Sequence, residues 1–226
     1  MEPDDATSHG VDSDRSDLPD VTRLLSLSDG VVAIALTLLV LNLRVPTVPT
    51  TKQNSAHALA VALGTHGDQI VSYLISFYVI AQFWLAHHRV FRHMAGHEEG
   101  LAWWNFAFLL TITLMPFTSN LLSDFPGNAL AVDIFAVNLL LASLSTQAVA
   151  VYGKQKHLLV PGTPDSAIYA GRARALAVAV AVGLSIGIAW VNTSVAKYCW
   201  LLMALAPWVA SHWIRRRRPT EAASSG

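Results

Sequence analysis

Long apolar stretches alternate with short polar connections along most of the chain. About 20 consecutive apolar residues let a helix cross a bilayer, and six stretches have this length or nearly so. They are Leu24–Leu43, Gln69–Val90, Leu101–Ser123, Ala129–Tyr152, Ala173–Val191 and Ala196–Ile214. The pattern therefore predicts an all-α, polytopic membrane protein with six transmembrane helices.

Polar tails flank this hydrophobic region. Residues 1–21 are rich in acidic residues and serine, which predicts a disordered cytoplasmic N-terminal tail. Residues 22–214 are predicted to be the six-helix transmembrane domain, and residues 215–226 a basic cytoplasmic C-terminal tail. The arginines at 215–218 favour an anchor to anionic lipid, and no nucleic-acid partner is expected.

Composition and charge support a membrane location. The chain is 53% hydrophobic and only 13% charged, which is unusual for a soluble domain. All but three of the 15 basic residues, the exceptions being Arg44, Lys52 and Lys197, fall on one side of the six predicted spans. Because basic residues are enriched in cytoplasmic connections, we expect a multi-pass protein of the cell membrane with both termini in the cytoplasm.

The first span begins with polar residues, among them Asp29. A carboxylate near the membrane needs a partner, and Arg23, six residues earlier, is poorly placed on the same helix. Two clusters lie at the same predicted level: "FWLAHHRVFRH" at residues 83–93 and "WWNF" at 103–106. We expect them to join the first helix in an interhelical network. Its candidate members are Arg23, Ser28, Asp29, His87, His88, Trp104 and Asn105.

Metal and catalytic chemistry are less well supported. His87, His88, His93 and His97 have helical spacings that would suit a metal site, but no cysteine accompanies them. Hydrogen bonding is favoured, and neither a metal nor a cofactor is expected. No catalytic constellation lies at one depth across the spans, so an enzyme is not expected.

Two further patterns concern helix faces. Ile34, Leu38 and Leu41 are four and then three residues apart, so they share one stripe with Thr37 beside it. Every face of this span is apolar, and periodicity alone fits ordinary lipid or helix contact as well as a pore. Gly183 and Gly187 have the GxxxG spacing, which predicts close helix approach.

Three segments resemble a known family. "RLLSLSDGVVAIALTLLVLNLRVP" at residues 23–46 resembles the first helix of the transmembrane protein 175 family, the endolysosomal potassium channels and their bacterial relatives. Arg23, Ser28 and Asp29 match its motif, whereas Leu27 stands at a position that is aromatic in the family. "SFYVIAQFWLAHHRVF" at 76–91 and "WWNFAFLLTITLMPFTSNLL" at 103–122 extend the resemblance to roughly residues 22–214.

The resemblance implies a non-canonical tetrameric cation channel that favours potassium. In such a homotetramer four copies of the first helix surround the pore, with Ile34 at the tightest constriction, Leu38 and Leu41 in the next layers, and Thr37 at a selectivity position. The network residues would act in gating or assembly. Potassium, and also other monovalent cations or protons, would be the permeant ions.

A secondary transporter or proton-permeable carrier of the plasma membrane is the alternative. Such proteins usually have charged or broken helices near the midplane. The ionisable residue that comes nearest to this pattern is Asp133, near one end of the fourth span. The channel is therefore favoured.

Overall fold

The computed structural model describes residues 17–47, 55–96, 98–196 and 199–200, in which α-helices dominate. The helices are α1 (Asp17–Leu38), the 3-10 helix η1 (Leu39–Asn42), α2 (Ala56–Thr65), α3 (Gly67–Phe91), α4 (Glu99–Asp124), α5 (Ala129–Gln155) and α6 (Asp165–Ala189). The predicted all-helical class is confirmed.

Five helices in the described part are long and apolar enough to cross a membrane: α1 continued by η1, α3, α4, α5 and α6. They correspond to the first five predicted spans. The sixth, Ala196–Ile214, lies mostly outside the described residues, and so do residues 215–226 and most of the N-terminal segment. The count of six therefore stays a prediction.

Helix ends differ in detail from the predicted limits. The first helix begins at Asp17, ahead of residue 22, and tightens to η1 at Leu39.

The short helix α2 precedes α3, and its first turn is capped by Ser55, whose hydroxyl oxygen accepts a hydrogen bond from the backbone N–H of Ala58 at 3.3 Å. This cap satisfies one of the backbone donors that every helix start leaves open.

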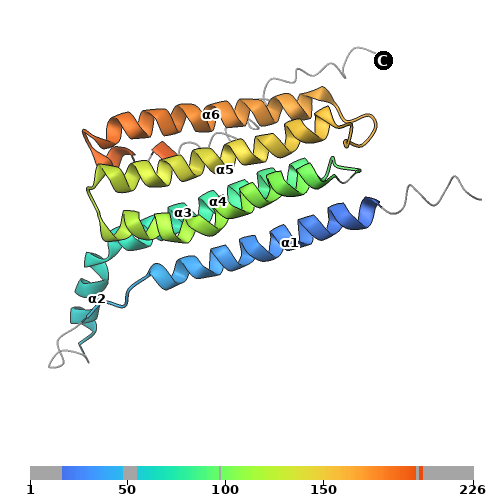
Figure 1. The fold of residues 1–226 in the computed structure, drawn as a ribbon. Coiled ribbons are helices and arrows are strands. Elements are labelled where there is room, and N and C mark those ends of the chain that lie inside the picture. Colours follow the sequence, from blue (N-terminus) through green and yellow to red (C-terminus); the bar gives the residue numbers. More distant parts are fainter. Residues whose placement is uncertain (1–16, 48–54, 97, 197–198, 201–226) are drawn as a thin grey trace, which may run out of the picture.

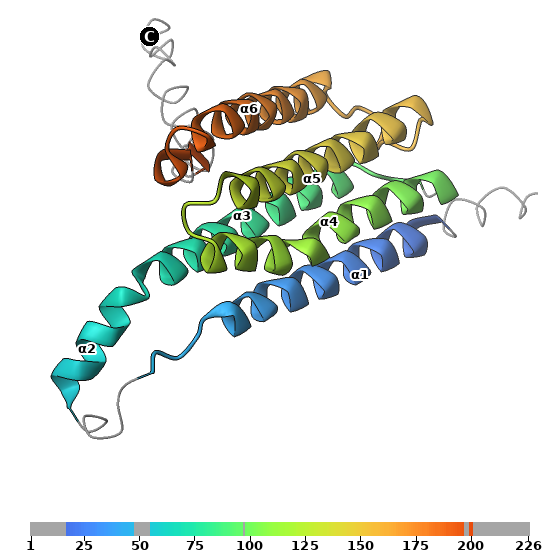
Figure 2. The same ribbon diagram turned by 60° about the vertical axis from the view of Figure 1, so that its left-hand side comes forward.

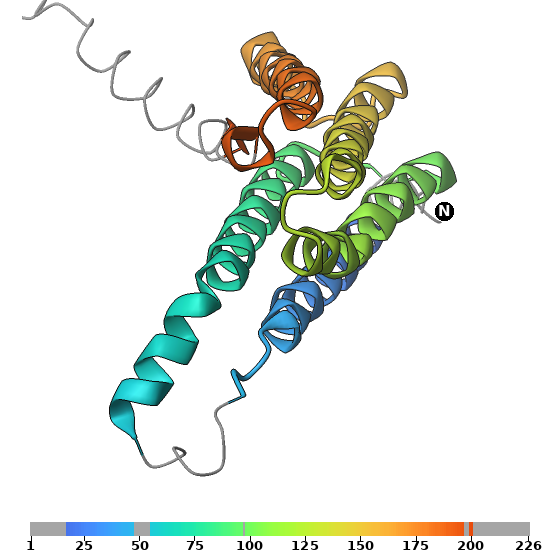
Figure 3. The same cartoon turned by 90° about the vertical axis from the view of Figure 1, so that its left-hand side faces the viewer.

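The long helices form a bundle in which α4 and α5 are central. Helix α4 packs against α1, α3 and α5, and α5 also packs against α3 and α6. Figure 1 shows α1 and α6 on opposite sides of this bundle. Helix α2 projects from the end at which α1 finishes (Figure 2), and it leads into α3 (Figure 3).

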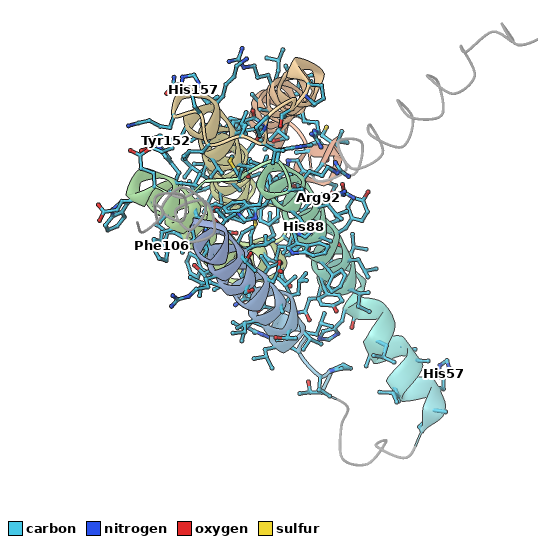
Figure 4. The ribbon with its side chains drawn as sticks, turned by 90° about the vertical axis from the view of Figure 1, so that its right-hand side faces the viewer. His57, His88, Arg92, Phe106, Tyr152 and His157 are labelled. Atoms are coloured by element: carbon cyan, nitrogen blue, oxygen red, sulfur yellow. The ribbon has the colours of Figure 1, made fainter. Side chains whose placement is uncertain are left out.

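The bundle has two ends that matter for the site. We call the end with the start of α1 and α4 and the ends of α3 and α5 the inner end, because the sequence predicts that it faces the cytoplasm. The opposite end is the outer end. Figure 4 views the molecule from the inner end, with His88 and Arg92 on the side of α3, and Tyr152 and His157 at the end of α5.

A continuous core joins the long helices. Its fully buried side chains include Ile80, Phe108, Ile112, Met115, Phe135 and Leu139. Two of the hydrogen bonds inside it join different helices: the Ser76 hydroxyl donates to the Ser119 hydroxyl oxygen at 2.7 Å, and the Asn138 amide donates to the Thr111 carbonyl at 3.1 Å. Since a buried polar group without a partner is costly, these bonds restrict how the helices can slide past one another.

The two loops at the inner end are bonded to each other. The backbone N–H of Ala95 donates to the Leu158 carbonyl at 2.7 Å, and that of Val160 donates to the His93 carbonyl at 2.9 Å. Lys156 and Glu98 add an exposed ion pair at 2.9 Å. The ends of α3 and α5 and the start of α4 are therefore held in one structured unit.

The close helix approach predicted for the GxxxG pair stays a prediction, because no described helix covers Gly183 or Gly187 and the sixth predicted span lies mostly outside the described residues. A Cβ added to Gly183 or Gly187 would meet no described atom within 4 Å. A close approach occurs at Gly100, where an added Cβ would overlap the Tyr152 hydroxyl. A side chain at position 100 would therefore force the Tyr152 ring at the end of α5 to move.

Candidate functional site

The inner end of α1 is tied to α3 and α4 by one buried hydrogen-bonded cluster, which we call the inner triad: Ser28, His87 and Asn105. All three residues have no exposed surface. His87 Nε2 lies 2.7 Å from Asn105 Oδ1, and Asn105 Nδ2 lies 3.0 Å from Ser28 Oγ. Each member comes from a different helix, so the triad fixes the relative height of α1, α3 and α4.

The number of available hydrogens gives one consistent assignment of donors and acceptors in the inner triad. Ser28 has a single hydroxyl hydrogen, which it donates to the Leu24 carbonyl at 2.8 Å. Its oxygen can then accept from the Asn105 amide N–H, which leaves Asn105 Oδ1 to accept from His87 Nε2–H. The imidazole ring stacks on Phe108, with centroids 4.3 Å apart and planes inclined by 10°. Hydrogen bonds and stacking together hold one orientation of the ring.

Asp29 finds its partner outside the triad. The indole N–H of Trp84 on α3 donates to Asp29 Oδ1 at 2.7 Å. The Trp84 ring lies beside the imidazole of His88, with centroids 5.5 Å apart, and His88 Nδ1 is buried without a hydrogen-bond partner among the described residues. Trp84 lies in the sequence cluster considered above but was not among the predicted network residues. The sequence contained one signal for this role: the Trp84 indole is a large apolar group with a single N–H donor, and it lies one helical turn before His88.

Two further predicted network residues lie on the surface of the single chain. Arg23 and Trp104 are exposed, and Arg23 lies on a different face of α1 from the buried Ser28, because five residues advance a helix by well over one turn. The structure thus brings Ser28, His87 and Asn105 together and joins Asp29 to Trp84. Among the described residues no group of three His, Cys, Asp or Glu side chains could hold a metal ion.

The middle of α1 has two contrasting faces. Val32, Ala35 and Leu39 are buried in the core. Ile34, Leu38 and Leu41 point away from it and are 60%, 43% and 74% exposed. An apolar stripe left uncovered by its own chain can contact lipid, a second subunit or the lumen of a pore.

Thr37 lies on the exposed side of the same helix. Its hydroxyl donates to the Ile34 carbonyl at 2.8 Å. The hydroxyl hydrogen is therefore used within the helix, and the oxygen lone pairs remain available as acceptors.

Sequence reasoning missed the contacts that hold the outer end of α1. Asn42 Nδ2 donates to the Pro116 carbonyl at 2.8 Å, and the Arg44 guanidinium pairs with Asp124 at 2.8 Å. The backbone N–H of Arg44 also donates to Gln69 Oε1 at 3.3 Å. Isolated polar residues at the ends of apolar spans were the only signal, and they did not reveal which residues pair.

Comparison with known proteins supplies independent information. Residues 23–116 match the family model described as the endosomal/lysosomal potassium channel TMEM175. A potassium channel of Streptomyces collinus is 28% identical over 188 residues, which is 81% of this chain and 89% of the relative. The human endosomal/lysosomal proton channel TMEM175 is 30% identical over 146 residues, which is 64% of this chain and 28% of the human protein.

A solved structure resembles the whole bundle. The crystal structure of a lysosomal potassium-selective channel TMEM175 homologue from Chamaesiphon minutus has a TM-score of 0.66 and 25% sequence identity. The match covers 83% of this chain and 98% of that one. The matched segment 23–116 contains the inner triad, Asp29 with Trp84, and the exposed stripe of α1. Residues 23–116 thus match the TMEM175 family, and over most of its length the chain is similar to ion channels and not to enzymes.

Proposed function

We propose that the protein is a potassium-permeable cation channel formed by four copies of this chain, with α1 of each copy lining the pore. The observation that carries this proposal is the exposed apolar stripe of Ile34, Leu38 and Leu41 on a helix whose other face is buried. The relatives from Streptomyces collinus and Chamaesiphon minutus are both named potassium channels, which supports potassium as the permeant ion.

Ile34 forms the constriction in this proposal, and Leu38 and Leu41 line the next layers. A ring of branched aliphatic side chains can close a narrow pore by dewetting, and a small helix rotation can widen it. Potassium is less strongly hydrated than sodium, so partial dehydration at such a ring costs it less. Thr37 offers a hydroxyl oxygen as acceptor next to the constriction, because its hydrogen is bonded to the Ile34 carbonyl.

The inner contacts serve gating or assembly in this proposal. Ser28, His87 and Asn105 set the height of α1, and the bond from Trp84 to Asp29 limits its rotation. Arg23, His88 and Trp104 complete the proposed set. Arg23 and Trp104, exposed on the single chain, then face neighbouring subunits or the membrane interface.

Charge distribution supports the proposed orientation, with both termini in the cytoplasm and the protein in the cell membrane. Most described basic residues lie at the inner end: Arg23, Arg89, Arg92, Lys154, Lys156, Arg172 and Arg174. Arg44 is at the outer end. This asymmetry matches the enrichment of basic residues on the cytoplasmic side of membranes.

Proton permeation is the second candidate, because the animal relatives are named proton channels. It would use the same pore and the same α1 stripe. A carrier mechanism remains the alternative to both, and it differs from them in kinetics: a carrier gives saturable flux without unitary current steps.

The decisive experiment is single-channel recording of the full chain in planar bilayers with potassium, sodium or proton gradients. Stepwise currents whose reversal potential follows potassium support the proposal. Ile34→Ala should raise the unitary conductance and reduce the preference for potassium. Leu176→Ala is the matched control, because Leu176 is 67% exposed on α6, across the bundle from α1.

Unchanged conductance and selectivity in Ile34→Ala, with normal protein yield, would remove Ile34 from the pore. Equal effects of Ile34→Ala and Leu176→Ala would also contradict the proposal, because only α1 is proposed to contact the ion.

A further inference from the structure

The outer end of α1 carries an ion pair that spans two helices. Arg44 follows η1, and its Nη2 lies 2.8 Å from Asp124 Oδ2 at the end of α4. The arginine side chain is 66% exposed, whereas the aspartate side chain is only 24% exposed. The positive member therefore projects into the solvent, and the negative member lies against the protein.

The position of Arg44 is fixed by contacts other than the ion pair. Its backbone N–H donates to Gln69 Oε1 at 3.3 Å, and Asn42, two residues earlier, donates to the Pro116 carbonyl at 2.8 Å. The exposed stripe continues directly to this level, with Leu41 74% exposed. The chain thus holds a cationic side chain at the outer end of the same helix that carries the stripe.

We propose that Asp124 is a conductance-determining residue, because it neutralises Arg44 at the outer mouth of the pore. This inference rests on the proposed function, in which four copies of α1 surround the ion path. Four copies of Arg44 then encircle its outer entrance, and an uncompensated ring of positive charge would repel cations. An exposed ion pair contributes little to stability. In this proposal its role is electrostatic: Asp124 cancels the positive potential that Arg44 would create at the outer mouth.

The size of this effect depends on salt. Four unit charges about 10 Å from a cation in water would lower its local concentration about twofold at 0.15 M salt. At 0.03 M the longer Debye length raises this to roughly fivefold, and at 1 M, where the Debye length is about 3 Å, the effect disappears. A neutralising Asp124 removes the repulsion under all three conditions.

The experiment compares unitary currents that enter a single channel from its two ends, in symmetrical KCl at 0.03 M and at 1 M. Asp124→Asn keeps the size of the side chain and removes only its charge. We expect current entering from one end, the outer mouth, to fall about three- to fivefold at 0.03 M, with little change for the other direction and none at 1 M. Arg44→Gln should increase the same current at low salt.

The double variant Arg44→Gln with Asp124→Asn provides the control, because it removes both charges and should return the current ratio to that of the unmodified protein. The proposal is overturned if Asp124→Asn leaves currents at 0.03 M unchanged, or if it changes them equally at 1 M. Ile34→Ala, measured in the same experiment, distinguishes a failure of this inference from a failure of the proposed pore. If it raises conductance while Asp124→Asn does nothing, only this inference fails; if Ile34→Ala also does nothing, the pore assignment fails.

Discussion

Replacing Asn105 by alanine removes the central member of the inner triad. The substitution takes away the acceptor of His87 Nε2–H and the donor to Ser28 Oγ. Both partners are fully buried, so neither can turn to water. The imidazole N–H is the more serious loss, because its ring is held by stacking on Phe108 and cannot easily move to another acceptor.

The expected destabilisation combines two contributions. Interhelical hydrogen bonds in membrane proteins are worth about 0.6 kcal/mol on average and at most about 1.7 kcal/mol each. A buried donor left without a partner adds about 1–3 kcal/mol. Asn105→Ala should therefore destabilise the fold by roughly 2–4 kcal/mol. Thr113→Ala, at an exposed hydroxyl of the same helix that bonds only to the Leu110 carbonyl, should cost well under 1 kcal/mol.

The measurement is the thermal midpoint of the purified protein, read as the loss of the monodisperse peak in size-exclusion chromatography. Removing both polar groups together, in Asn105→Leu with His87→Phe, should restore part of the midpoint, because no buried donor is then left unpaired. If Asn105→Ala melts at the same temperature as Thr113→Ala, the triad does not stabilise the helix ends. If the double variant is less stable than Asn105→Leu alone, the assignment of the unpaired imidazole as the main cost is wrong.

Two predictions concern the loops and helix ends at the inner side. Gly100→Ala should destabilise the protein by about 1–3 kcal/mol, because the new methyl group would overlap the Tyr152 hydroxyl. Gly183→Ala is the control, because its methyl group would meet no described atom and should not destabilise the protein. The thermal midpoints of the two variants test this prediction, and equal midpoints would refute the packing argument. Lys156 holds the pKa of Glu98 below its usual value of 4.5, so the stabilisation from this pair is present above that value and is lost as the pH falls through the lowered pKa. The midpoint difference between the unmodified protein and Glu98→Gln should therefore shrink on acidification below about pH 4, and a difference that grows there would contradict the sign.

The helices were predictable because each one is long and apolar, which is a local property of the sequence. The first five spans were located to within a few residues, apart from the earlier starts of α1 at Asp17 and of α6 at Asp165, and the change of α1 to η1 at Leu39. Helix packing was less predictable. The GxxxG spacing at Gly183 and Gly187 gives α6 a smooth surface, but whether another helix packs on that surface depends on the arrangement of the whole bundle. Among the described residues, a close contact between α4 and α5 lies at Gly100 instead.

The candidate site was predicted from an electrostatic requirement. A carboxylate and a serine at the mouth of an apolar helix need partners at the same depth, and this argument led to the neighbourhood of His87 and Asn105. It could not pair individual atoms, because the partner of each group depends on helix rotation. Trp84 therefore went unassigned as the donor to Asp29. The exposed stripe of Ile34 could not be predicted from the sequence either. Every face of α1 is apolar, so only the packing of the bundle determines which face is buried and which is exposed.

The two ends of α1 are held by contacts of different physical character, and this difference separates assembly from ion entry. The inner triad is buried and built from neutral hydrogen-bonding groups, so added salt has little effect on it. The outer pair is exposed at Arg44 and responds directly to ionic strength. Between them, the apolar side chains of Ile34, Leu38 and Leu41 are exposed and form no polar contact with any described residue that would resist a small rotation. In Asp124→Asn, where the positive charge of Arg44 is no longer compensated, the current through the proposed channel should therefore depend more strongly on external salt than in the unmodified protein, while the thermal midpoint stays the same. A midpoint that falls together with the current would show that the outer pair is also needed to hold α1 in place.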